Sequence, residues 1–263
     1  IIRDELGFDF IQEVDFKQVY RDCSVFCDMI HTPEQARRKS VIACQTALAK
    51  RGVAVLIVPA DISASVVDDN IPYAVHVARP VTRPNEADLA EIAEILNKSE
   101  NVVLYGGSGC QGAHQEILAV ANKLKAPIAH TSRAKDFLEF DNPYNIGMTG
   151  MLGNEAGYHA LLDCDALLML GADFAWRQFY PDKAKIVQVD IDHTHLGRRH
   201  PIAKGVVGDV KATLEALLPK LRERDDASFR SAYVKRYATY RESERAKVAV
   251  GHDGSIPGTY LTK

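Results

Sequence analysis

The sequence predicts an α/β protein with a doubly wound parallel sheet and a partial α/β unit ahead of it. Short apolar runs that fit strands covered on both faces alternate with segments of helical periodicity along most of the 263 residues. Glycine-rich segments follow several of these runs, as they do at turns between strands and helices. Such alternation implies parallel strands joined by helical crossovers, which predicts a Rossmann-like sheet.

The composition is that of an ordinary globular protein. Lys and Arg number 32 against 35 Asp and Glu, so the basic surplus of a nucleic-acid-binding protein is missing. No apolar run approaches the roughly 18 residues that a membrane span needs. The five cysteines are scattered and odd in number, which favours a reducing, cytoplasmic environment over a disulfide framework.

The first part of the chain, residues 1–64, reads as the end of an α/β unit. A segment of mixed polarity, 18–30, predicts a helix with Cys23 and Cys27 on one face. With no second pair of ligands nearby, these cysteines are predicted to be apolar packing residues rather than metal ligands. The proline-punctuated stretch 65–84 predicts an extended linker.

A helix and a strand are expected within this first part. Residues 32–50 predict a helix that Thr32 caps, with Gln35 completing a capping box. The β-branched run 53–58 predicts a strand buried on both faces, as in a parallel sheet.

Residues 85–224 predict the central domain, in which strands and helices alternate regularly. The expected helices are 85–97, 113–125, 155–162 and 210–222. The expected strands are 101–105, 127–131, 166–170, 185–189 and 206–207. Residues 225–263 predict a charged helix, 228–250, and a polar tail that together would lead toward a further domain.

A G-x-G-x-x-G sequence follows the first central strand and opens a helix. It begins Gly107-Ser108-Gly109 and ends at Gly112. Such glycines let backbone N–H groups approach a pyrophosphate at a helix N-terminus, although glycine turns also serve packing alone. No carboxylate stands about twenty residues further on, so a standard NAD site is not predicted.

Two acidic residues end later strands, at the edge where open α/β sheets bind ligands. Asp190 ends the strand 185–189, and Asp209 follows 206–207. Either could accept hydrogen bonds from ligand hydroxyl groups, and for each an ordinary helix-capping role remains open. Lys135, after another strand, could offset ligand phosphates. Three glycine-rich loops gather at the same edge and predict one extended ligand: 107–112, 147–153 and 171–174.

Several catalytic motifs are absent. The sequence has no G-x-S-x-G elbow and no phosphate-binding G-x-x-x-x-G-K-[ST] loop. Three histidines, His193, His195 and His200, stand near one turn without acidic or cysteine partners at ligand spacing, so solvated or capping roles are predicted. No metal site is expected in this chain.

At these loops the sequence resembles the thiamine-diphosphate-dependent pyruvate oxidases, especially the quinone-linked pyruvate dehydrogenases of bacteria. The similarity runs nearly end to end and covers the tail of the first of three α/β domains and the whole of the second. Matching stretches include Gln12-Glu13, Gly107-Ser108-Gly109-Cys110, Asp141-Asn142-Pro143-Tyr144, Gly147-Met148-Thr149-Gly150, Phe179-Tyr180-Pro181, Gln188-Val189-Asp190-Ile191 and Gly208-Asp209.

The resemblance implies a FAD site in the central domain. It implies FAD contacts at Thr149, Gly150, Met151, Leu152, Ala172, Asp173, Phe174, Ala175, Trp176 and Asp190. Lys135 matches the family's flavin-phosphate loop, and Gln12 matches a side chain that reaches the thiamine site in relatives.

The activity that the resemblance implies is oxidative decarboxylation of pyruvate or a similar 2-keto acid. Thiamine diphosphate and Mg²⁺ would activate the substrate, and FAD would pass electrons to a quinone or oxygen. The thiamine-activating glutamate would precede residue 1 and the magnesium motif would follow residue 263, so this chain alone is expected to be inactive. The parent is expected to be a homo-oligomer, a dimer or tetramer, in the cytoplasm or at the periphery of the inner membrane.

Two alternatives stay open within the same resemblance. The central domain could be a structural or regulatory domain without flavin, as in simple 2-keto-acid decarboxylases. The parent could instead be an acetolactate-synthase-like carboligase, which would also retain FAD.

Overall fold

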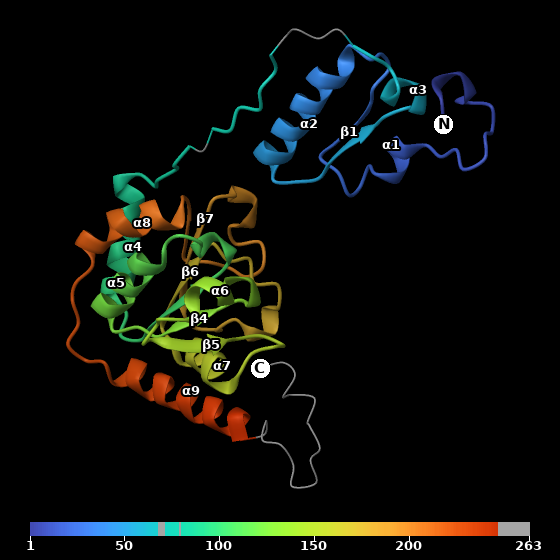
Figure 1. Cartoon of the computed structure of the whole chain (residues 1–263). Helices are drawn as coiled ribbons and strands as arrows, with labels where there is room; N and C mark the ends of the chain where they lie inside the picture. The colour runs from blue at the N-terminus through green and yellow to red at the C-terminus, as the bar shows by residue number, and fades with distance from the viewer. Residues whose placement is uncertain (68–71, 79, 247–263) are drawn as a thin grey trace, which may run out of the picture. The chain divides into compact units, whose positions relative to one another are not determined.

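The computed structural model of the chain describes residues 1–67, 72–78 and 80–246. These divide into two compact units, residues 1–80 and 81–263 (Figure 1). None of the described helices is long and apolar enough to cross a membrane.

The first unit is a small α/β layer around two parallel strands. Strands β1 (Phe26–Met29) and β2 (Ala54–Ile57) pair in register from Phe26 with Ala54 to Met29 with Ile57, and α2 (Gln35–Lys50) connects them. Short helical turns complete it: Arg3–Glu5, α1 (Phe16–Val19) and α3 (Ala60–Ser63).

Three predictions for this unit differ from the structure. Residues 26–29 form a strand, because pairing with the apolar residues of β2 outweighs a weak local helical pattern, so Cys23 and Cys27 do not share a helix face. Both strands are only half buried, not covered on both faces. The helix begins at Gln35 rather than near Thr32, and the Gln35 side chain accepts a hydrogen bond from the His31 N–H at 3.1 Å.

The second unit contains a six-stranded parallel sheet. Its order is β5 (Asn145–Met148), β4 (Ile128–His130), β3 (Val102–Gly106), β6 (Ala166–Leu170), β7 (Lys185–Asp190) and β8 (Lys204–Val207). The chain moves outward from β3 in one direction and then from β6 in the other, so the order reverses between these two strands. This is the doubly wound α/β fold that the sequence predicted.

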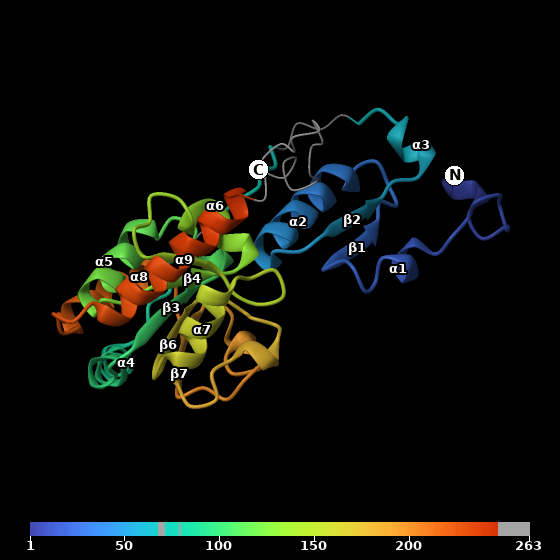
Figure 2. The same ribbon diagram turned by 90° about the horizontal axis from the view of Figure 1, so that it is seen from below.

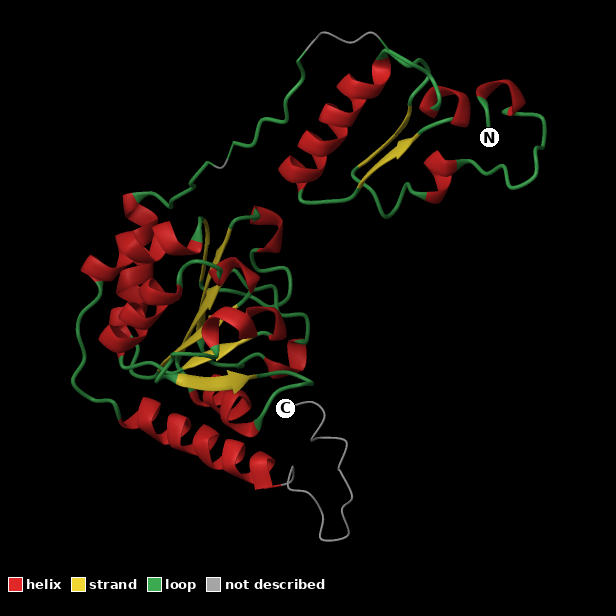
Figure 3. Ribbon diagram, in the orientation of Figure 1, coloured by secondary structure: helices red, strands yellow, loops and turns green. Residues whose placement is uncertain are grey.

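Helices cover both faces of this sheet (Figures 2 and 3). One face packs against α4 (Glu86–Lys98), α5 (His114–Leu124) and α8 (Val210–Leu217), and the other against α7 (Glu155–Asp163) and α9 (Ser228–Ala246). The strands alternate accordingly: Val102 and Leu104 face the first core, and Val103 and Tyr105 the second. Shorter turns are Ser108–Cys110, Ser132–Ala134, α6 (Lys135–Leu138), Arg177–Phe179, His193–His195 and Leu218–Lys220.

The central elements agree with the sequence prediction with two main differences. Strand β5 was not expected, and α8 ends at Leu217, before Pro219. The helix predicted in the segment 225–263 packs against α7 and β5, and the Tyr233 hydroxyl donates a hydrogen bond to Asp163. Its predicted end at 247–250 lies outside the described residues.

Candidate functional site

The order of the sheet reverses where the loops after β3 and β6 meet, and these loops touch through glycines. The Gly107 N–H donates to the Leu170 carbonyl at 2.9 Å, and the Gly109 N–H to the Gly171 carbonyl at 3.1 Å. A Cβ atom on Gly107 would lie 2.2 Å from the Gly171 oxygen, and one on Gly109 2.8 Å from the Gly171 Cα. The first two glycines of the motif therefore permit loop-to-loop contact, and their N–H groups are already engaged. Ser108, between them, is exposed at this edge.

The loop after β5 places a buried hydroxyl beside exposed apolar side chains. Thr149 is 6% exposed, and among the described residues its Oγ1 has no hydrogen-bond partner. Met151 and Leu152 are 70% and 76% exposed. Gly150 has a φ of 98°, and a Cβ there would lie 3.0 Å from the Phe174 ring, so the loops after β5 and β6 are neighbours.

The loop after β6 carries an aromatic cluster. Phe174 is buried and packs edge-on against Tyr105 with a ring-centroid distance of 5.1 Å. Its carbonyl accepts a hydrogen bond from the Tyr180 hydroxyl at 2.8 Å. Trp176 lies 5.8 Å from the Phe174 ring and stays half exposed, whereas Ala172 is buried and Ala175 exposed. An aromatic surface is therefore available beside the Thr149 loop.

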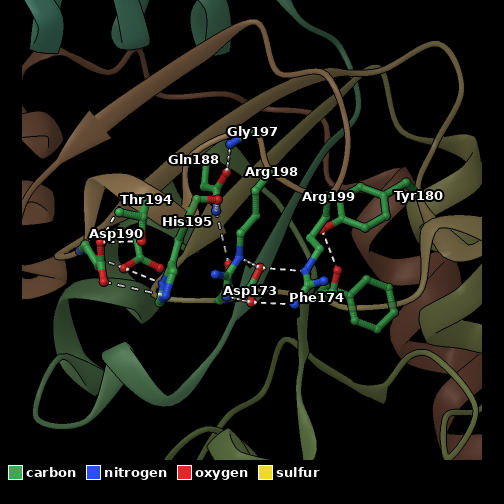
Figure 4. A network of polar contacts seen from close by, with 12 residues as sticks. Asp173, Phe174, Tyr180, Gln188, Asp190, Thr194, His195, Gly197, Arg198 and Arg199 are labelled. Atoms are coloured by element: carbon green, nitrogen blue, oxygen red, sulfur yellow. Dashed lines mark hydrogen bonds and ion pairs between the residues drawn. The ribbon is translucent and has the colours of Figure 1, made fainter. Parts of the chain in front are cut away.

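Asp173 holds two arginines (Figure 4). Arg198 donates from Nε at 3.0 Å and from Nη2, and Arg199 donates from Nε and Nη2 at 3.1 and 3.2 Å. These charge-assisted contacts lower the pKa of Asp173 to about 2. The predicted ligand residue is thus an ionised carboxylate that positions two cations.

Asp190 is buried at the end of β7 and is already engaged by its own loop. Its Oδ1 accepts from the Asp192 N–H at 2.9 Å and lies 3.2 Å from His195 Nδ1. The Gln188 amide fastens the same loop to the sheet: it donates to the His195 carbonyl at 3.2 Å and accepts from the Gly197 N–H at 2.9 Å. Asp192, not Asp190, caps the following turn His193–His195, so Asp190 makes a contact within its own loop rather than the helix cap that the sequence left open. A ligand role for Asp190 stays a prediction.

Three other predicted site residues lie in different settings. Asp209 caps α8 by accepting from the Ala212 N–H at 2.9 Å. Lys135 is the first residue of α6, and its Nζ lies 3.6 Å from Glu139 Oε2. Gln12 is exposed in the first unit with a left-handed φ of 68°. The structure thus brings the loops after β3, β5, β6 and β7 to one edge of the sheet, and Gln12 belongs to the other unit.

Comparison with known protein families shows which family the central part of the chain matches. Residues 89–217 match the family model described as "Thiamine pyrophosphate enzyme, central domain". Residues 89–217 therefore belong to the thiamine pyrophosphate enzyme central-domain family.

Three relatives illustrate the range of this family. An uncharacterized 42.6 kDa protein of Pseudomonas amyloderamosa is 44% identical over 98% of this chain, which covers 65% of that protein. The putative thiamine pyrophosphate-containing protein YdaP of Bacillus subtilis is 31% identical over 87% of the chain and 40% of its own length. A probable acetolactate synthase large subunit of Methanocaldococcus jannaschii is 28% identical over 82% of the chain and 39% of its own length. The chain spans less than two thirds of each relative.

The broader part of the expected resemblance, to the central domain of thiamine pyrophosphate enzymes, is confirmed by the match of residues 89–217. Of the three relatives above, one is named as an acetolactate synthase and none as a pyruvate oxidase, so the narrower assignment stays a prediction.

The sequence analysis did not predict the side chains that contact Asp173 and Asp190 in the central domain. His195 Nδ1 lies 3.2 Å from Asp190 Oδ1, a contact that the sequence did not predict. Arg198 and Arg199 were not singled out. Two local signals were present: the spacing Asp190-x-Asp192-x-x-His195, and the basic run Arg198-Arg199-His200 after Gly197.

Proposed function

We propose that this chain is the nucleotide-binding central region of a thiamine-diphosphate-dependent enzyme that acts on 2-keto acids, with acetolactate-synthase-like carboligation as its reaction. The match to the central-domain family supports the thiamine-dependent class. The relative named as a probable acetolactate synthase favours carboligation over pyruvate oxidation. The proposals for thiamine diphosphate, Mg²⁺, the 2-keto acid substrate and subunit assembly apply to the whole protein rather than to this chain alone.

The ligand proposed for the central domain is FAD, and the observation that carries it is the buried Thr149 hydroxyl. A buried hydroxyl without a partner is costly, which is expected where a ligand completes the hydrogen bond. Met151, Leu152 and Trp176 offer exposed apolar surface at the same edge for a planar ring system. When bound, FAD supplies two-electron redox chemistry in oxidases.

The protein's own contribution at this edge is binding and orientation. Thr149 would donate or accept one hydrogen bond, and Asp190 would accept from a hydroxyl group of the ligand. The aromatic cluster around Phe174 makes the loop after β6 rigid, because Tyr180 and Tyr105 contact it from two sides. Phosphate groups of the ligand would have to find donors other than the Gly107 and Gly109 N–H groups, which are engaged.

A second candidate is a central domain without flavin, acting as a structural or regulatory unit. The specific observation in its favour is that Asp190 and the motif glycines are satisfied within the protein. In that case Thr149 would be a buried hydroxyl tolerated for structural reasons.

Titration of the full chain with FAD tests the proposal. Trp176, the single tryptophan, lies at the proposed site, so bound flavin should quench its fluorescence. Saturable quenching by FAD that Thr149→Val weakens supports the flavin site, and no binding by folded protein favours the second candidate.

The reaction class is tested on the full-length parent with pyruvate. Formation of acetolactate identifies a carboligase. Reduction of a quinone or of oxygen with release of acetate or acetyl phosphate would instead restore the pyruvate oxidase prediction.

A further inference from the structure

A shallow basic hollow lies next to the proposed ligand edge and has no role in the function proposed above. Its volume is about 310 Å³, and it is lined by Arg177, Gly197, Arg198, Arg199, His200 and Pro201. All of these residues come from the turn after β6 and from the loop between β7 and β8. The hollow is therefore formed at one end of the sheet by two loops of the central domain.

The three guanidinium groups of this hollow are paired unequally. Arg198 and Arg199 contact the carboxylate of Asp173. The pKa of Arg198 is raised by its hydrogen bond to Asp173 and also by the charges of Asp192 and Asp190. Within residues 1–67, 72–78 and 80–246, the side chain of Arg177 makes no ion pair or hydrogen bond. Like charges gathered in this way repel one another unless an anion joins them.

The donors that line the hollow are held in place before any ligand binds. Arg198 and Arg199 each use Nε and Nη2 toward Asp173, which fixes both planar groups and leaves their Nη1 atoms for another acceptor (Figure 4). The loop that carries them is tied to β7 by the contact between Gln188 and the Gly197 N–H. Fixed donors lose little conformational entropy on binding, which favours affinity.

His200 is also oriented. Its ring stacks on Tyr180 with a centroid distance of 5.0 Å and an interplanar angle of 2°. Its Nδ1 lies 2.9 Å from the Pro201 carbonyl oxygen, and because a carbonyl only accepts, Nδ1 carries the proton of that contact. Nε2 is then the ring nitrogen available to a ligand, and it becomes a donor when the imidazole is protonated.

We propose that this hollow binds a phosphate or pyrophosphate group through Arg177, Arg198 and Arg199. Arg177 has no acidic partner among the described residues, and Arg198 and Arg199 each keep an Nη1 atom that does not contact Asp173, so three guanidinium groups can donate to one anion, an arrangement that suits the several oxygens of a phosphate group. The group can come from inorganic phosphate compounds or from a nucleotide. The proposal does not depend on FAD, because none of these three residues belongs to the proposed flavin contacts.

Isothermal titration of the full chain at low ionic strength tests this proposal, with inorganic pyrophosphate and ADP as probes. Arg177→Gln is the decisive variant, since it removes no contact within the described structure and should leave stability unchanged. It should weaken pyrophosphate binding at least about tenfold, as expected for loss of a charge-assisted contact. Arg199→Gln should weaken binding similarly, with folding checked by thermal melting.

The matched control is Arg222→Gln. Arg222 lines a second shallow hollow of about 340 Å³, in which Lys98 pairs with Glu94 and Lys220 pairs with Glu86. Because Arg222 is the one arginine among the described residues that lines this hollow, Arg222→Gln should bind pyrophosphate as the wild type does. ADP binding much more tightly than pyrophosphate identifies a nucleotide site, and equal affinities identify a site for inorganic phosphate compounds. The proposal is overturned if folded wild-type protein binds neither probe at millimolar concentration, or if Arg177→Gln and Arg222→Gln have equal effects.

Discussion

Replacing Gly107 by Ala separates the packing role of the glycine motif from a phosphate-binding role. The new Cβ would lie 2.2 Å from the Gly171 oxygen, 2.6 Å from the Ala172 Cα and 2.8 Å from the Ala172 Cβ. An ordinary contact begins near 3.4 Å, so the loops after β3 and β6 must separate by about 1.2 Å, the difference between 3.4 and 2.2 Å. Backbone atoms cannot rotate away as a flexible side chain can, so the strain reaches both loops.

The cost of this separation can be worked out from the contacts that it breaks. The hydrogen bonds from the Gly107 and Gly109 N–H groups, at 2.9 and 3.1 Å, would both be lost. Two hydrogen bonds at about 0.5 to 1.5 kcal/mol each, with about 1 to 3 kcal/mol for overpacking, give a loss of about 2 to 6 kcal/mol in the free energy of unfolding.

Gly112→Ala is the control. Gly112 lies in the same motif with a φ of 81°, and a Cβ added there would have no atom within 4 Å, so only the left-handed backbone is penalised, at about 1 to 2 kcal/mol. Urea unfolding followed by Trp176 fluorescence reports on the central unit for both variants. If Gly107→Ala is as stable as the wild type, or no less stable than Gly112→Ala, the loop-contact argument is refuted.

Three further predictions concern the polar residues of the same edge. Asp190→Ala should lower the free energy of unfolding by about 1 to 3 kcal/mol, because it removes the contacts to the Asp192 N–H and His195. The same change should weaken FAD binding about tenfold or more. Unchanged FAD affinity together with a lower melting temperature would make Asp190 purely structural. Thr149→Val keeps the shape of the side chain and removes a hydroxyl that has no partner among the described residues. The free energy of unfolding in urea should therefore stay within about 1 kcal/mol of the wild type, while FAD affinity falls. A large loss of stability would mean that the hydroxyl has a partner in the protein. The pKa of Asp173 is lowered from 3.8 to about 2, so the stability that its ionised form contributes is complete above about pH 4 and is lost as the pH falls toward 2. The difference in urea midpoint between wild type and Asp173→Asn should therefore shrink over that range, and a difference that is constant down to pH 2 would contradict the assignment.

The sequence predicted the central sheet well because its strands are continuous apolar runs. Residues 166–170 are buried at every position and were assigned without error, and the neighbouring strands differ from prediction by only a few residues at their ends. The two strands that were not predicted share one cause. Strand β1 depends on pairing with residues 28 positions away, and β5 contains Gly147 in a left-handed conformation, so neither has a local pattern that indicates a strand.

The sequence could predict where the candidate site lies but not which residues contact one another in it. Asp190 ends β7, and Asp173 lies in the glycine-rich loop after β6. Because parallel strands bring their carboxyl ends together, both residues could be placed at one edge from the sequence. Their partners could not be, because Arg198 and His195 reach them through a loop that folds back over the edge. The engagement of the Gly107 N–H group likewise depends on a loop that is more than 60 residues away.

The two-stranded sheet of the first unit has a consequence for handling the protein. Among the described residues, β1 and β2 each pair on one side only, so both present backbone N–H and C=O groups along an open edge. Val25 and Val53, which precede these strands, are 37% and 59% exposed, and neither edge is protected by a proline within the strand. Open, apolar edges are templates for adding a strand from another chain. Aggregation of the purified chain should therefore start in residues 1–80 and grow with protein concentration, and Val53→Lys should slow it.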